Sequence, residues 1–105
     1  MEFFEIATLR SYYGVLLTKK QNDMLKMHYD EDLSLAEIAE VYGISRQAVA
    51  DSLAKGEKSL CDYDAKLGLI AKDKSIVEIL DSLDVEGQSP EVLAAIARIR
   101  RVLED

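Results

Sequence analysis

The side chains best suited to molecular recognition are grouped just after Ser45, at the start of a predicted helix. The guanidinium of Arg46 can hold a phosphate or hydrogen-bond to guanine, and the Gln47 amide can pair with adenine. Ala50 is small enough to allow close approach to a groove. The carboxylate of Asp51 repels phosphate, although it can accept from a cytosine amine. This combination favours nucleic-acid binding through one face of the helix.

The helical period determines which of these side chains share a face. With Val49 and Leu53 facing inward at about 100° per residue, residues 47, 51, 54 and 58 face outward. Arg46 and Ala50 then lie on one flank, and Lys55 lies on the other. The predicted nucleic-acid-binding residues are therefore Ser45, Arg46, Gln47, Ala50, Asp51, Lys55 and Lys58.

The residues before this helix have the order that a helix-turn-helix requires. A capping box predicts a short helix over residues 35–42, in which the small Ala39 allows close packing. Gly43 permits a tight turn, Ile44 fills the corner, and Ser45 caps the second helix. Several independent positions agree, so the structural motif is predicted separately from any binding function.

Apolar residues recur at helical spacing along the whole chain, and alternating strand patterns are absent. The fold class is therefore predicted to be all-α, with a helix-turn-helix core and additional C-terminal helices. The predicted helices cover residues 3–16, 19–30, 35–42, 46–72 with a weak point at Gly56 or Gly68, 74–84, and a last helix from Pro90. The domains are expected to be a helix-turn-helix domain over 1–72 and a helical extension over 73–105.

The C-terminal half has more apolar surface than one small motif needs to cover. The apolar positions run from Leu60 through Leu83, and the last helix adds a further stripe. One interpretation is a homodimer in which residues 73–105 are the dimerisation element and bring two recognition helices together. The alternative is that these helices fold back on the motif as part of its core.

Charge and composition limit the function classes. The chain has 105 residues with a net charge of −7, which excludes a generally basic nucleic-acid coat protein but allows a small binding face. Its one cysteine cannot form an internal disulfide, and the acidic N-terminus does not resemble a secretory signal, so a cytoplasmic location is expected. No apolar run approaches the roughly 20 residues that a membrane span requires.

Catalysis and metal binding are not predicted. His28 is the one histidine and Cys61 the one cysteine, so the usual zinc-ligand set cannot be assembled. A core histidine and a packed cysteine are the simpler interpretations. Convincing paired carboxylates for acid–base chemistry are lacking. We expect no catalytic residue, no cofactor and no metal, and thus a protein that is not an enzyme.

Residues 34–60 resemble region 4 of bacterial sigma factors, and residues 12–70 resemble the YlxM family of small bacterial helix-turn-helix proteins. The Ser-Arg-Gln-Ala-Val string is the most specific part of this likeness. The residues that carry it are Tyr12-Tyr13, Leu16-Leu17-Thr18, Gln21, Tyr29, Leu35, Glu37-Ile38-Ala39-Glu40, Ser45-Arg46-Gln47-Ala48-Val49, Asp51, Leu60, Tyr63 and Lys66-Leu67.

The resemblance implies an all-α, sigma-region-4-like regulator. Genes of this family typically lie beside that of the signal recognition particle GTPase, which implies a role in that pathway. The first hypothesis is thus a cytoplasmic regulatory protein that binds DNA or RNA. The second is a protein-interaction module that binds no nucleic acid and contacts that GTPase or RNA polymerase through its acidic faces.

Overall fold

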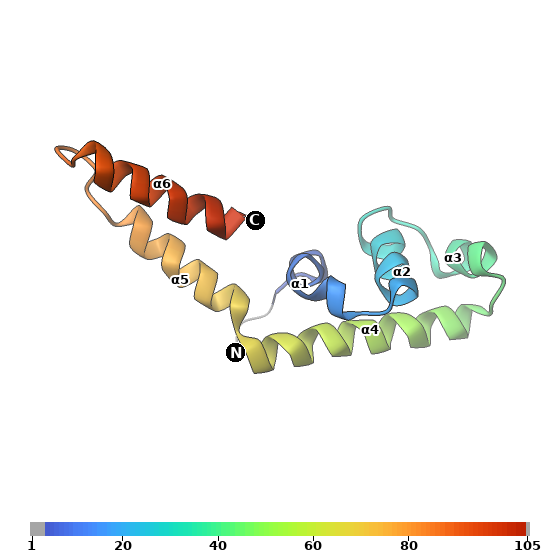
Figure 1. The fold of residues 1–105 in the computed structure, drawn as a ribbon. Helices are drawn as coiled ribbons and strands as arrows, with labels where there is room; N and C mark the ends of the chain where they lie inside the picture. The colour runs from blue at the N-terminus through green and yellow to red at the C-terminus, as the bar shows by residue number, and fades with distance from the viewer. Residues whose placement is uncertain (1–3, 105) are drawn as a thin grey trace. The chain divides into compact units, whose positions relative to one another are not determined.

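The computed structural model describes residues 4–104. Over that range the chain forms α-helices and one short 3-10 helix, and no strand, which confirms the all-α prediction. The contacts divide the chain into two units, with the division between Gly68 and Leu69. Figure 1 labels the helices in chain order.

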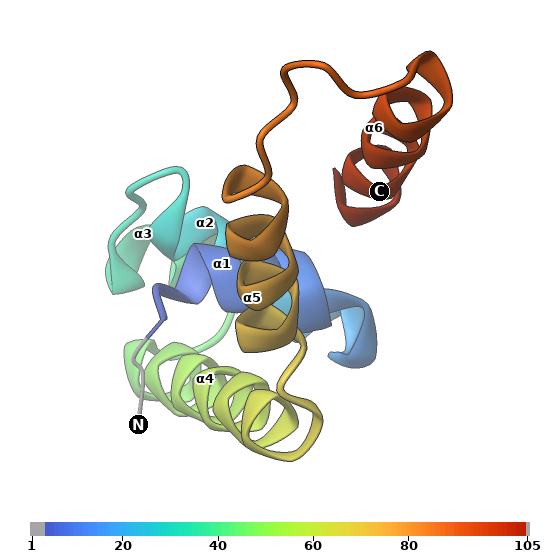
Figure 2. The same cartoon turned by 90° about the vertical axis from the view of Figure 1, so that its left-hand side faces the viewer.

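The first unit contains α1 (Ile6–Tyr13), the 3-10 helix η1 (Gly14–Leu16), α2 (Lys19–Tyr29), α3 (Leu35–Tyr42) and α4 (Arg46–Leu67). Figures 1 and 2 show α1, α2 and α3 on the same side of the long α4. All three contact it, so α4 is the common support of the unit.

The core of this unit lies between α4 and the three shorter helices. Burying one large apolar side chain contributes about 1.5–3 kcal/mol, so this set supplies most of the favourable free energy of folding. The buried apolar residues are Leu9, Tyr13, Met24, Leu25, Ile38, Ala39, Val49, Leu53 and Leu60.

The helix starts follow the predicted caps. The Thr18 hydroxyl accepts from the Gln21 amide at 3.1 Å, and the Gln21 side chain accepts from the Thr18 amide. Ser34 and Glu37 make the same reciprocal pair at 3.1 and 3.0 Å. Both capping boxes are confirmed. They could be predicted from the sequence because each depends only on residues three positions apart.

The first predicted helix differs from the observed one. α1 begins at Ile6, and residue 3 of the predicted range lies outside the described residues. After Tyr13 the chain tightens into η1. Gly14 is buried there, and a Cβ at this position would lie 3.0 Å from both Arg10 Cγ and Asn22 Oδ1. The missing side chain lets the turn pack closely against α2.

α4 ends at Leu67, earlier than the predicted limit at Lys72. Gly68 adopts the left-handed conformation with φ 60°, and its N–H donates to the Asp64 carbonyl at 2.8 Å. Gly56 remains helical although it was the other expected weak point. A Cβ on Gly56 would lie 3.0 Å from Leu25 Cδ1, so this glycine allows α2 to approach α4.

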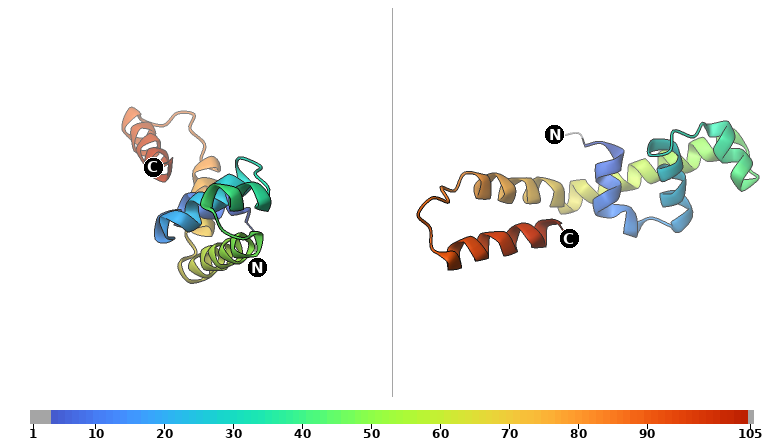
Figure 3. Two further views of the ribbon diagram at one scale, coloured as in Figure 1. Left: turned by 90° about the vertical axis from the view of Figure 1, so that its right-hand side faces the viewer. Right: turned by 90° about the horizontal axis from the view of Figure 1, so that it is seen from above.

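The second unit consists of α5 (Leu69–Asp81) and α6 (Pro90–Glu104) in its described part. α5 begins before the predicted residue 74, because the early end of α4 releases residues 69–73. Figure 3 shows the two helices running in opposite directions, and they contact each other. Ser89 caps α6 by accepting from the Val92 amide at 3.2 Å, with Pro90 at the first helical position. No helix in the described range has the length and apolarity that crossing a bilayer requires.

Candidate nucleic-acid interface

The turn between α3 and α4 sets the direction of α4, the second helix of the motif. Gly43 has φ 66°, and its N–H donates to the Ala39 carbonyl. The Ile44 amide donates to the same carbonyl at 3.1 Å. The Ser45 hydroxyl then accepts from the Ala48 amide at 3.0 Å, so α4 begins at Arg46. Each end of the turn is thus held by hydrogen bonds.

The inner face of the motif is the predicted one. Ile38 and Val49 are fully buried, and Ala39 and Leu53 are 7% and 5% exposed. α3 and α4 are in contact, and the small side chain of Ala39 leaves room for close packing. The inward direction of Val49 and Leu53 is confirmed, and it orients the opposite face of α4 toward solvent.

The predicted binding residues lie on this outer face, and most are exposed. Ala50 is half-buried on the flank, as its small side chain permits. The exposed members are Ser45, Arg46, Gln47, Asp51, Lys55 and Lys58.

Two of these side chains are already joined to each other. Gln47 Nε2 donates to Asp51 Oδ1 at 2.9 Å, one helical turn apart. A base edge that needs the Gln47 amide must therefore compete with Asp51. The same carboxylate places a negative charge in the middle of the face, which opposes phosphate contact.

The basic residues of this face differ in whether their charged groups have a partner within the protein. Lys58 Nζ pairs with Asp62 at 2.9 Å, and that hydrogen bond raises the pKa of Lys58. Among the described residues, Arg46 and Lys55 have no hydrogen-bond or ion-pair partner. Arg46 is also at the first position of α4, where side chains of a recognition helix reach base edges.

α2 supplies further basic groups near the motif. Lys19 pairs with Asp23 at 3.3 Å, while Lys20 Nζ lies 5.7 Å from the ring centre of Tyr42 on α3. The Lys20–Tyr42 contact could not be read from spacing, because it joins two helices. α3 itself exposes Glu37 and Glu40. The pKa of Glu37 is lowered by hydrogen bonds from Ser34, so this residue is a carboxylate at neutral pH.

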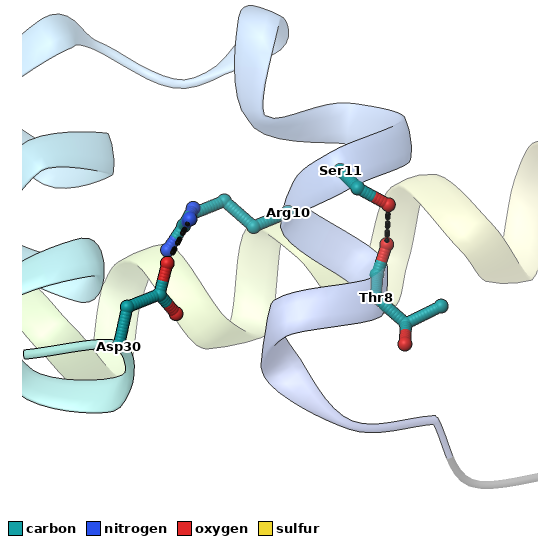
Figure 4. Close-up of polar contacts among 4 residues, drawn as sticks. All are labelled: Thr8, Arg10, Ser11 and Asp30. Carbon is teal, nitrogen blue, oxygen red and sulfur yellow. Dashed lines mark hydrogen bonds and ion pairs between the residues drawn. The ribbon is translucent and has the colours of Figure 1, made fainter.

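The remaining polar contacts of the unit hold helices together. Figure 4 shows the Arg10 guanidinium of α1 reaching Asp30 after α2, at 2.5 Å, beside the local bond from the Ser11 hydroxyl to the Thr8 carbonyl. Arg10 lowers the pKa of Asp30. Tyr29 donates to Glu57, which raises the pKa of Tyr29 to about 12.

His28 and Cys61 have no partners that would make a catalytic or metal site. His28 Nδ1 donates to the Leu33 carbonyl at 2.9 Å, which closes the loop between α2 and α3. Cys61 is exposed as a free thiol. In the described part of the chain no three His, Cys, Asp or Glu residues are grouped as metal ligands.

Comparison with known proteins gives a consistent result. The family model UPF0122, described as "Putative helix-turn-helix protein, YlxM / p13 like", matches residues 2–102. A UPF0122 protein of Desulforamulus reducens is 44% identical over 110 residues, covering 98% of this chain and 94% of that protein. A UPF0122 protein of Clostridium perfringens is 47% identical over 83 residues, covering 79% of this chain and 74% of that protein.

Proposed function

Because the chain belongs to the UPF0122 family of YlxM/p13-like helix-turn-helix proteins, we propose that it is a cytoplasmic, non-enzymatic regulator that binds duplex DNA through the start of α4. The observation that carries this proposal is Arg46: it is exposed and unpaired among the described residues, at the first position of a helix whose direction is set by a capped turn.

The residues of the outer face have separate roles in this proposal. Arg46 holds a phosphate or reads guanine, and Gln47 reads adenine once it leaves Asp51. The hydroxyl hydrogen of Ser45 is available to a phosphate, because the capping bond uses only the oxygen. Ala50 allows close approach, and Lys55 and Lys58 add contacts further along the helix.

The charge of the protein makes the expected binding weak and salt-dependent. Three phosphate contacts, from Arg46, Lys55 and Lys58, would lower the affinity about fortyfold between about 50 and 200 mM salt. Two copies joined through residues 73–105 would present two recognition helices to two half-sites. Such pairing is the way in which many helix-turn-helix proteins reach useful affinity.

The test is fluorescence anisotropy of a labelled random duplex at these two salt concentrations. Arg46→Ala should weaken binding severalfold and lower the magnitude of the salt slope by about 0.9. Arg101→Ala is the matched control, because it removes the same charge from an exposed position in the second unit. An equal loss of duplex affinity in both variants would show that the effect of Arg46→Ala comes from net charge alone. Absence of binding at low salt would exclude duplex DNA as the target. Tighter binding to an RNA duplex would indicate RNA as the target instead.

The second candidate is a protein-interaction module in the signal recognition particle pathway. The observation in its favour is the acidic outer surface of the motif, where Glu37, Glu40 and Asp51 are exposed. The family resemblance suggests the particle's GTPase as the partner, and a basic RNA-binding surface would complement these charges. Salt-dependent co-purification with the GTPase, lost in Glu37→Gln/Glu40→Gln, together with no duplex binding, would favour this candidate. Binding to RNA polymerase instead would separate the protein from that pathway.

A further inference from the structure

α6 carries two apolar stripes, and the first of them belongs to the contact with α5. Ile96 and Leu103 are half-buried on this stripe. Arg100 lies beside them, and its guanidinium pairs with Asp81 of α5 at 2.9 Å. The polar pair and the half-buried residues place this side of α6 toward α5.

The second stripe is partly open to solvent, and most so toward the C-terminal end of α6. Its members, which we call the α6 seam, are Val92, Ala95, Ile99 and Val102. Val92 and Ile99 are 42% and 44% exposed, and Val102 is 74% exposed. A shallow groove runs along the seam, and Arg98 completes its lining. No residue of α6 is buried, although the helix is amphipathic.

The second unit is too small to be stable with this surface uncovered. It extends from Leu69 to the C-terminus, and its buried apolar residues are Ile70 and Leu80. Units below about 40 residues usually need disulfides, metals or oligomerisation to fold. The free thiol of the chain lies in the first unit, and no metal-ligand group occurs among the described residues. Burial of this surface against further protein is the remaining means of stabilisation.

The spacing of the seam indicates what kind of surface covers it. Val92, Ala95, Ile99 and Val102 follow each other at intervals of three, four and three residues, which is the repeat by which like helices pack as a coiled coil. Val92 and Ile99 place β-branched side chains at equivalent positions of that repeat, an arrangement found in two-stranded pairs.

The charges beside the seam fit a surface that carries both signs. Arg98 lines the seam groove, and Glu91 lies seven residues before it on the same side of α6; neither has an ion-pair partner among the described residues. A second copy of the same hairpin supplies basic and acidic groups together, whereas a uniformly charged partner would leave one sign unmatched.

We propose that the α6 seam is the interface through which two copies of this chain associate, with the two hairpins forming a four-helix arrangement. This interface is the surface through which the dimer joined by residues 73–105 would form. It does not depend on nucleic-acid binding, because it rests on the second unit alone.

The test is sedimentation velocity of the full-length protein at micromolar to submillimolar concentrations. The unaltered protein should sediment at twice the chain mass of 11.8 kDa. Ile99→Glu/Val102→Glu should raise the dissociation constant at least about a hundredfold, because association would bury unpaired carboxylates. Ala94→Glu/Ala97→Glu is the matched control, since it adds the same charges to exposed positions on the opposite side of α6. Circular dichroism should show unchanged helix content in the control, and in the seam variant at most the loss of α5 and α6, because its second unit is no longer covered.

Cysteine cross-linking is a second measurement, and it tests the interface even if the seam variant unfolds. In a Cys61→Ser background, Ala95→Cys should be joined into dimers by a short bismaleimide, and Ala97→Cys should not. A monomer at all concentrations would overturn the proposal. So would slow labelling of Ala95→Cys in a monomer, since the chain would then cover its own seam. Duplex binding is measured separately, so a failure of the interface is distinguishable from a failure of the proposed function.

Discussion

The Gln47 amide donates to the Asp51 carboxylate at 2.9 Å across one turn of α4, on the face proposed to meet DNA. Under the proposed function, Asp51 therefore competes with a base for the Gln47 amide. Asp51→Ala should free Gln47 and remove a charge that repels phosphate, so duplex affinity should rise severalfold at low salt. Fluorescence anisotropy measures this change.

Asp84→Ala is the matched control for this prediction. It removes one exposed carboxylate from the second unit, so it changes net charge equally without touching the face. An affinity gain of the same size in both variants would show that the Gln47–Asp51 pair has no specific effect on binding.

The turn of the motif depends on Gly43. Its φ of 66° is unfavourable for a residue with a Cβ, although no atom would collide with that Cβ. Gly43→Ala should therefore lower the free energy of unfolding by about 1–2 kcal/mol, purely through backbone strain. Gly43→Asn should cost less, because Asn tolerates this region. Urea denaturation gives both values, and equal stability of all three proteins would contradict the described turn.

Tyr13 connects α1 to the far end of α4. Its ring is 1% exposed, and its hydroxyl donates to Asp64 Oδ1 at 2.7 Å. Tyr13→Phe leaves a half-buried carboxylate with one donor fewer, so we expect a loss of about 1.5–3 kcal/mol in unfolding free energy. Tyr63→Phe is the control: its hydroxyl lies 3.5 Å from the Leu16 carbonyl, and its loss should cost under about 0.5 kcal/mol. Equal effects would exclude a specific role for the Tyr13–Asp64 bond.

The Arg10–Asp30 pair predicts a defined pH response. Hydrogen bonding to Arg10 lowers the pKa of Asp30 below its usual 3.8. The pair's contribution to stability is therefore fully present above the usual value and is lost as pH falls through the lower, folded-state value. NMR titration should show the Asp30 carboxyl returning toward its usual pKa in Arg10→Met. Lys26→Met should change it less, because Lys26 acts only through its more distant charge. A carboxyl that titrates normally in the unaltered protein would contradict this contact.

Local signals predicted much of the fold and the face of the candidate site. The Ser34–Glu37 and Thr18–Gln21 boxes, and the Ser45 cap, each depend on residues three positions apart, and all of them are observed. The Gln47–Asp51 contact also has a local signal, since residues four apart are neighbours on a helix. Arg10–Asp30 and Lys20–Tyr42 have no such signal, because they join different helices.

The sequence by itself determined the all-α class, the helix starts and the outward face of α4, because capping and the helical period act within a few residues. Only the tertiary structure decided between Gly56 and Gly68 as the end of α4. Gly56 stays helical where Leu25 packs against it, whereas Gly68 takes a left-handed conformation with no atoms near its missing Cβ. The same residue type thus continues α4 at one position and ends it at another, since packing between α2 and α4 at Gly56 outweighs a local propensity of about 1 kcal/mol.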